Sequence, residues 1–230
     1  MSKSPGAQPF TVLYEDNHLI AVSKKAGILV QGDQTGDVPL LDLVKEYIRE
    51  KYDKLGEAFL GTIHRLDRPV SGLVLFARTS KALERMNEEF RTRNVQKTYR
   101  AAIGKKPPQD QGTLKSWLVK NEATNTVRAY AKEVSGSQYA ELDYTLIGRF
   151  GNIYLLEVNP LTGRPHQIRV QLAGMGCPIV GDLKYGYPKP NSDGSILLHA
   201  FGLSFIHPVK KEPIAIEAPL PRTGEWEFLS

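Results

Sequence analysis

The chain has 230 residues and a formal net charge of +5, and 41% of its residues are hydrophobic while 24% are charged. A chain of this size and composition can bury a sizeable core without disulfides or a structural metal. Its single cysteine, Cys177, excludes an internal disulfide and favours a reducing compartment. No apolar stretch approaches the ~20 residues that span a bilayer. We therefore expect a cytoplasmic protein that makes no use of a membrane.

Positive charge is concentrated in two segments that lie far apart in the sequence. Residues 61–106 contain eleven basic and four acidic side chains, and residues 164–211 contain six and two. If the fold brought the segments together, they would form a basic surface suited to a phosphate backbone. Charge alone slightly favours the alternative, which is two separate solvated faces.

The first half of the chain alternates between strand and helix patterns. Strands are expected at 10–14 and 18–22, around a turn at 15–17. Asp37 is a candidate N-cap, with Pro39 in the first turn of a helix whose apolar residues recur with helical period. Further along the chain, the expected features are an irregular segment at 53–62, a buried strand at 73–77, and a second helix capped by Thr79 or Ser80.

The second half of the chain is rich in strand patterns. The turn at 161–165 precedes a short helix at 166–173, with Gly174 as its expected C-cap. Many strands and few helices predict an α+β fold with a mixed, largely antiparallel central sheet and flanking helices. We expect a disordered tail at 1–9 and a single domain at 10–230. The expected strands are 97–103, 113–119, 138–147, 152–158, 196–206 and 212–218, with a polar loop at 121–126.

Several familiar catalytic motifs are missing from the sequence. It contains neither a G-x-x-x-x-G-K-[ST] phosphate loop nor a G-x-G-x-x-G turn after a strand. The five histidines do not have metal-ligand spacing, and Ser71 is not in a G-x-S-x-G elbow. Cys177 fits a packed small residue better than a nucleophile. These absences argue against ATP hydrolysis, nicotinamide chemistry, zinc catalysis and triad hydrolysis.

The segment from His64 to Gly72 places the carboxylate of Asp67 between Arg65 and Arg68, just before a buried strand. Adjacent cations favour the charged form of a carboxylate. A charged aspartate beside a cleft can act as a nucleophile or base without a metal. A salt-bridged loop that only stabilises the strand is an equally good explanation of the local pattern.

Two further segments combine basic residues with groups suited to nucleic acid. Tyr99 lies between Lys97 and Arg100, so it could stack on a base while its neighbours hold phosphates, although a strand tyrosine more often packs in the core. His166 and Arg169 are three residues apart and would share one face of a short helix. Arg169 could then reach a buried carboxylate, and the alternative is a surface helix with solvated charges.

Taken in order, four motifs resemble the RluA-type family of pseudouridine synthases. They are H-R-L-D-R-x-x-S-G, K-T-Y-x-A, T-G-R-x-H-Q-I-R and G-D-x-x-Y-G. The resemblance runs from about Val12 to Ala218. It implies the pseudouridine synthase fold with a central active-site cleft. It also implies an isomerase that flips a uridine out of structured rRNA or tRNA and rejoins its base through C5, with neither cofactor nor metal.

The resemblance also implies roles for individual residues. Asp67 would be the catalytic aspartate, and Tyr99 would stack on the target base and could assist loss of the C5 proton. Arg169 would pair with Asp67, and Arg65 would fill the gap left by the flipped nucleotide. The remaining residues expected to bind RNA are His64, Arg68, Arg164, His166 and Gln167.

The sequence departs from the family at Val70, where threonine is usual, and at Lys25, where proline is usual. Neither position touches the expected chemistry. Two other functions stay open: a catalytically silent RNA-binding protein on the same scaffold, and a glycosidic hydrolase using Asp67, which would normally need a second carboxylate or a metal. A monomer is the simplest expectation, and the target RNA is not specified.

Overall fold

The computed structural model describes residues 9–33, 35–53 and 56–229, and it divides the chain into two compact units. Unit 1 contains the chain up to Val95 together with Gly202–Ala218. Unit 2 contains Gln96–Phe201 together with the residues from Pro219 onward. Residues 1–8, most of the tail expected to be disordered, lie outside the described residues. The single domain expected at 10–230 remains a prediction.

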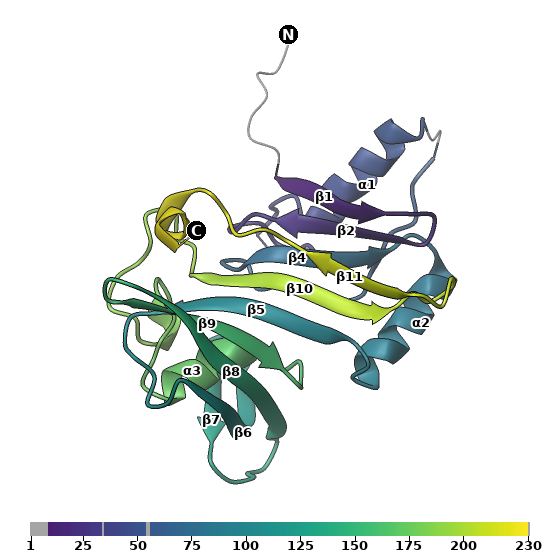
Figure 1. Ribbon diagram of the computed structural model, residues 1–230. Coiled ribbons are helices and arrows are strands. Elements are labelled where there is room, and N and C mark those ends of the chain that lie inside the picture. The colour runs from purple at the N-terminus through teal and green to yellow at the C-terminus, as the bar shows by residue number, and fades with distance from the viewer. Residues whose placement is uncertain (1–8, 34, 54–55, 230) are drawn as a thin grey trace. The chain divides into compact units, whose positions relative to one another are not determined.

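Unit 1 combines short antiparallel strands with two helices (Figure 1). Strand β1 pairs with β2, β2 and β3 pair with β4, and β10 pairs with β11. The expected strands and both expected helices of this region are confirmed, whereas the two-residue β3 falls in the segment expected to be irregular. The elements are β1 Phe10–Glu15, β2 Leu19–Lys24, α1 Leu40–Lys51, β3 Gly61–Thr62, β4 Ser71–Ala77, α2 Ser80–Arg91, β11 Pro213–Glu217 and the end of β10 Leu198–Ile206.

Strand β4 is buried along its whole length, and the sheet that contains it has a helix on each face. On one face, Leu73 and Leu75 pack with Met86 of α2 in a hydrophobic cluster. On the other face, Phe10 of β1 meets Tyr47 of α1 edge to face at 6.0 Å. The strand registers place Phe10 on the opposite side of the sheet from Leu73, so α1 and α2 lie on opposite faces. A strand buried on both sides is well fixed in space, and the loop before it contains Asp67.

The two helices of unit 1 begin in different ways. Thr79 caps α2, since its side chain accepts a hydrogen bond from Ala82 N, as expected. The prediction that Asp37 is the N-cap of α1 is wrong. The cap is Pro39, and the first amides, Leu40 and Leu41, donate instead to carbonyls of the preceding loop. The Asp37 carboxylate forms an ion pair with Arg68.

Unit 2 is built on a five-stranded antiparallel sheet in the order β5-β9-β8-β6-β7. Strand β7 was not expected, and the other strands of the sheet are confirmed, with ends that differ by up to three residues from those expected. Near its C-terminal end, the unit closes with a 3-10 turn at Gly224–Leu229. The sheet and its helix are β5 Gln96–Ile103, β6 Gln111–Asn121, β7 Thr126–Tyr130, β8 Gln138–Phe150, β9 Ile153–Pro160 and α3 Gln167–Gly174.

Helix α3 packs against one face of this sheet (Figure 1). Val170 forms a small cluster with Leu118, Val127 and Ala140 from three neighbouring strands. Six consecutive residues of α3 are buried, so the alternative of a solvated surface helix is excluded. The prediction that Gly174 is the C-cap of α3 is wrong. Gly174 is the last helical residue, Met175 is the C-cap, and Gly176 takes the left-handed conformation, with φ +83°.

No helix among the described residues is long and apolar enough to cross a membrane.

Cys177 packs as a buried residue after α3, as expected, and burial raises the pKa of its thiol.

Candidate active site

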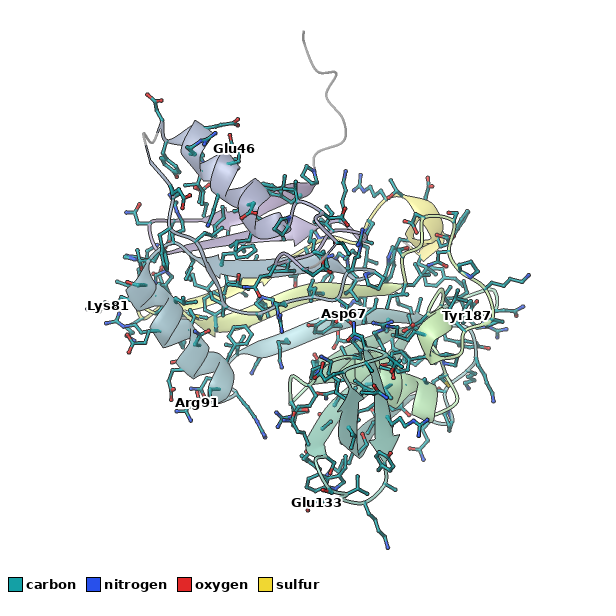
Figure 2. All side chains as sticks on the ribbon, turned by 180° about the vertical axis from the view of Figure 1, so that it is seen from behind. Glu46, Asp67, Lys81, Arg91, Glu133 and Tyr187 are labelled. Atoms are coloured by element: carbon teal, nitrogen blue, oxygen red, sulfur yellow. The ribbon has the colours of Figure 1, made fainter. Side chains whose placement is uncertain are left out.

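Asp67 lies on a short loop that is fixed at both ends. Leu66 before it and Val70 after it are buried. The backbone carbonyl of Asp67 accepts a hydrogen bond from Val70 N at 3.1 Å, which closes the loop as a tight turn before β4. The Asp67 side chain is half-buried, and Figure 2 labels it. The loop therefore presents one carboxylate from a rigid base.

His64 connects this loop to the core of unit 1. Its Nε2 accepts a hydrogen bond from the backbone N–H of Leu75 in β4, at 3.0 Å. Its ring stacks on Phe90 of α2, with ring centroids 5.1 Å apart and planes inclined by 17°. Two contacts to two elements are the pattern of a residue that positions its neighbours. The expected direct contact of His64 with RNA remains a prediction.

Lys24 supports the Asp67 loop through its buried ammonium group, although it was not among the expected site residues. It is 1% exposed, and its Nζ donates to the carbonyls of Lys25, Ile28 and Arg68 at 3.1, 2.8 and 3.3 Å. Burial lowers the pKa of Lys24 to about 7, partly opposed by the negative charge of Asp67. Lys24 is thus electrostatically coupled to the expected catalytic carboxylate.

The two arginines beside Asp67 have different surroundings. Arg65 is exposed, as a side chain expected to enter an RNA helix must be. Arg68 donates through Nε to the carbonyl of Gly27, and its Nη2 lies 2.7 Å from Asp37 Oδ2. Because the Arg68 side chain is still 47% exposed, its guanidinium can reach solvent while it ties the loops together.

In unit 2, the turn before α3 is fastened to β8 by side chains expected to bind RNA. Gln167 is buried; its amide donates to Glu141 O at 3.0 Å and accepts from Thr162 Oγ1 and Arg164 N. Arg164 donates through Nε to Tyr139 O at 3.0 Å. Gln167 therefore shapes the turn, and contact of either residue with RNA remains a prediction.

Arg169 is buried, and its guanidinium pairs with a buried carboxylate. Its Nε lies 2.7 Å from Asp182 Oδ2, and its Nη2 lies 2.9 Å from Asp182 Oδ1. Two parallel bonds fix the plane of the guanidinium group. Asp182 was not among the expected site residues, although the G-D-x-x-Y-G motif contains it.

Tyr185, in the same motif, is the second residue that was missed. Its hydroxyl lies 2.7 Å from His166 Nδ1 and accepts from Val127 N at 2.9 Å. The Arg169 guanidinium lies over its ring, 5.1 Å from the centroid. His166 is the N-cap of α3 and has left-handed φ, +51°. His166 and Arg169 thus converge on one aromatic ring.

Tyr99 lies on the face of the sheet that α3 covers. It pairs in register with Val158, which pairs with Tyr144, and Ala140 lies on the same face of β8 against α3. On the same strand, Lys97 donates to Thr162 O at 3.1 Å, in the turn before α3. The sheet register thus brings Tyr99 and Arg169 to one side of unit 2.

A pocket of about 340 Å³ opens beside this turn. Arg164 and Lys120 contribute cations to its lining, and Leu118 and Val127 contribute apolar surface. Within the described part of the chain, no three or more His, Cys, Asp or Glu side chains are grouped to hold a metal ion.

Asp67 belongs to unit 1, whereas Tyr99 and Arg169 belong to unit 2. Unit 1 fixes the carboxylate through its loop, and unit 2 fixes the aromatic and basic groups through its sheet and α3. The expected pairing of Asp67 with Arg169 remains a prediction, as do the roles of the other expected site residues.

Comparison with known proteins matches residues 18–174 to the family model for RNA pseudouridylate synthase. A protein of Chlorobaculum parvum named "Uncharacterized RNA pseudouridine synthase" is 32% identical over 96% of this chain and 74% of its own length. "Ribosomal large subunit pseudouridine synthase C" of Vibrio vulnificus is 31% identical over 91% of this chain. The chain spans only 65% of the length of that Vibrio protein.

Among solved structures, human RNA Pseudouridylate Synthase Domain Containing 4 superposes with a TM-score of 0.76 at 25% identity, covering 92% of this chain and 88% of that one. This agrees with the α+β, largely antiparallel fold expected from the sequence. The family match includes every segment that carries an expected site residue. The chain therefore belongs to the RNA pseudouridylate synthase family and has the fold of that family.

Proposed function

We propose that the chain isomerises uridine to pseudouridine in RNA of the large ribosomal subunit, with Asp67 as its catalytic carboxylate. The observation that carries the proposal is the family match over residues 18–174, which contains Asp67, Tyr99 and Arg169. The name of the Vibrio relative supports ribosomal RNA as the substrate, and transfer RNA is the alternative. The cytoplasmic location and the monomeric state expected from the sequence belong to this proposal.

The reaction breaks the bond between uracil N1 and C1′ of the ribose, turns the base, and joins C5 to C1′. A uracil inside a stacked helix is unreachable until it is flipped out, which costs ~a few kcal/mol. Stacking of the flipped base on Tyr99 would offset part of that cost. Arg65, which is exposed, would take the vacated place in the helix.

Asp67 would act on the flipped nucleotide, and Arg169 would pair with it. The two-point contact with Asp182 holds the Arg169 guanidinium in one orientation before substrate arrives. Pre-ordered charge of this kind favours a transition state, because no reorganisation is needed at the moment of reaction. The loop around Asp67 is likewise held in advance by Lys24 and His64.

The test is Asp67→Asn, assayed by tritium release from RNA that contains [5-³H]uridine. Isomerisation should fall below detection, while RNA affinity and the unfolding temperature stay close to wild type. Asp42→Asn is the matched control, because Asp42 is an exposed aspartate of the same unit, in the first turn of α1. It should keep nearly full activity.

An active Asp67→Asn enzyme would overturn the proposal. Release of free uracil by the wild type would favour the hydrolase, and RNA binding without any isomerisation would favour the silent RNA-binding protein. Pseudouridine mapping of ribosomal and transfer RNA, from cells with and without the gene, identifies the substrate. A site lost only from transfer RNA would contradict the ribosomal assignment.

A further inference from the structure

Three aromatic side chains form a row across the outer strands of unit 2. Trp117 of β6 pairs in register with Tyr130 of β7 on one side and with Tyr139 of β8 on the other. Residues paired across antiparallel strands point to the same face of a sheet, and neighbouring strands lie ~4.8 Å apart. The register therefore places the three side chains next to one another on one face of the sheet. We call Tyr130, Trp117 and Tyr139 the aromatic row.

The aromatic row lies on the face of the sheet turned away from α3. Helix α3 contacts the neighbouring positions, since Gln171 bonds Ser116 and Val170 packs on Leu118. Side chains alternate between the faces of a strand, so Trp117 points to the opposite side. Tyr130 is 37% exposed, and Trp117 and Tyr139 are half-buried. This face is separate from the one that holds Tyr99 and Arg169.

Trp117 and Tyr139 are held in place without being fully buried. Trp117 and Tyr139 meet edge to face, with ring centroids 5.5 Å apart and planes inclined by 67°. The Tyr139 hydroxyl donates to Glu141 Oε2 at 2.9 Å. An aromatic surface that is already fixed loses little conformational entropy when a flat ligand stacks on it.

Basic side chains flank the aromatic row on the same face. Arg128 is exposed and pairs in register with Val119, one step beyond Trp117 on the face that carries the row. Among the described residues, no ion pair or hydrogen bond engages the Arg128 guanidinium. On the other side, Lys115 is 61% exposed and lies 3.3 Å from Glu141. Aromatic rings between cations suit a ligand that alternates flat bases with phosphates.

We propose that the aromatic row, with Arg128 beside it, is a stacking platform for unpaired bases of the RNA substrate, outside the catalytic site. The proposal rests on the proposed function for its choice of RNA. A base stacks on any aromatic face without regard to sequence, so the platform would hold a single-stranded segment next to the modified structure. It would add affinity for long RNA and leave the chemical step unchanged.

Tryptophan fluorescence can measure binding at the platform directly, because Trp117 is one of only two tryptophans in the chain and the other, Trp226, is buried. In a Trp226→Phe protein, Trp117 is the only indole. A twelve-nucleotide single-stranded RNA should quench its emission, and a fully paired duplex of the same sequence should quench it weakly. No quenching, or equal quenching by both RNAs, would overturn the proposal.

Substitutions test the same surface by affinity. Tyr130→Ala should weaken binding of the single strand by about 5- to 150-fold, the loss expected for one stacked base. Arg128→Ala should weaken binding and lower the slope of log affinity against log salt by about 0.7. The control is Phe228→Ala, which removes an aromatic side chain of the same unit that is 76% exposed and lies outside the row. Unchanged affinity in both test variants, with unfolding temperatures equal to wild type, would overturn the proposal.

The platform can be separated from catalysis by one further comparison. Tyr130→Ala should raise KM for a long RNA and leave kcat unchanged, because the row lies away from Tyr99 and Arg169. In Trp226→Phe with Asp67→Asn, single-stranded RNA should still quench Trp117 although isomerisation is lost. Quenching together with an active Asp67→Asn enzyme would support the platform and contradict the proposed function.

Discussion

Arg169 and Asp182 form a buried ion pair in which two nitrogens of the guanidinium face two oxygens of the carboxylate, at 2.7 and 2.9 Å. The side chains are only 6% and 0% exposed. This geometry leaves the guanidinium one orientation, with its face over Tyr185. Arg169 is thus positioned by a residue thirteen positions later in the chain, before any substrate is present.

Asp182→Ala should therefore destabilise the protein by ~3–5 kcal/mol, because it leaves the buried charge of Arg169 uncompensated. Urea unfolding monitored by circular dichroism measures the loss. Asp110→Asn is the control, since Asp110 is a surface residue 3.7 Å from Lys106 in the same unit. It should change stability by less than about 1 kcal/mol.

Arg169→Lys separates charge from geometry at the same position. Lysine keeps the positive charge but cannot form the two-point contact. We expect kcat to fall at least tenfold at a temperature where the variant is fully folded. Wild-type kcat in Arg169→Lys would mean that the fixed guanidinium plane has no part in the reaction.

The buried Lys24 should make stability depend on pH. Burial lowers its folded-state pKa to about 7, whereas a lysine in the unfolded chain titrates near ~10.4. Between these values the unfolded chain binds the proton and the folded protein does not, so the contribution of Lys24 to the free energy of unfolding rises with pH from about 7 to about 10. Below pH 7 both states are protonated, and the contribution is constant.

Lys24→Met should be less stable than wild type at every pH, because the carbonyls of Lys25, Ile28 and Arg68 lose their donor. The difference between the two proteins should widen from pH 7 to pH 9.5 in urea unfolding. Lys25→Met removes the adjacent, exposed lysine and should retain the wild-type pH profile. A constant difference between Lys24→Met and wild type would contradict the lowered pKa.

His64 should prove to be a positioning residue. His64→Phe can keep the stack on Phe90 but leaves the buried N–H of Leu75 without an acceptor, at a cost of ~1–3 kcal/mol. His64→Gln offers an oxygen to that N–H and should recover part of the loss. Chemical denaturation measures stability, and fluorescence anisotropy with labelled RNA measures affinity. A large loss of RNA affinity at unchanged stability would instead assign His64 to direct RNA contact.

The sequence predicted the elements with strong local signals and missed those without them. The cap of α2 was readable because Thr79 precedes an apolar period, and β4 because five apolar residues follow one another. Strand β7 was missed because it is an edge strand with only Val127 buried, so its hydrophobic pattern is faint. Asp37 looked like an N-cap, but its carboxylate pairs with Arg68, a partner 31 positions away that local rules cannot see.

The sequence predicted which residues form the candidate site, but it predicted only some of the contacts between them. The four motifs located Asp67, Tyr99 and Arg169 within the segment that matches the family. Asp182 was missed because its partner Arg169 lies thirteen positions earlier in the chain, a contact that local sequence rules do not reveal. The burial of Lys24 was not foreseeable, since lysine is almost never fully buried.

Gly181, immediately before Asp182, gives the sharpest test of how this pair is held. Its φ is +86°, and an added Cβ would lie 2.6 Å from both the backbone oxygen of Ser195 and Asn191 Nδ2. Gly181→Ala therefore adds a clash with backbone to the ~1–2 kcal/mol cost of left-handed alanine. We expect a total loss above about 2 kcal/mol in urea unfolding. Since Asp182 must shift with its neighbour, kcat should fall as well.

Gly176→Ala is the matched control for this variant, because Gly176 has nearly the same φ, +83°, with open space around its Cβ position. Gly176→Ala should lose only the ~1–2 kcal/mol that left-handed alanine costs, and it should keep kcat near wild type. Equal stability and equal kcat in the two variants would show that the segment containing Asn191 and Ser195 moves to admit the added Cβ without displacing Asp182. Larger losses for Gly181→Ala in both measurements would tie the position of Asp182, and through it the orientation of Arg169, to the packing of that loop.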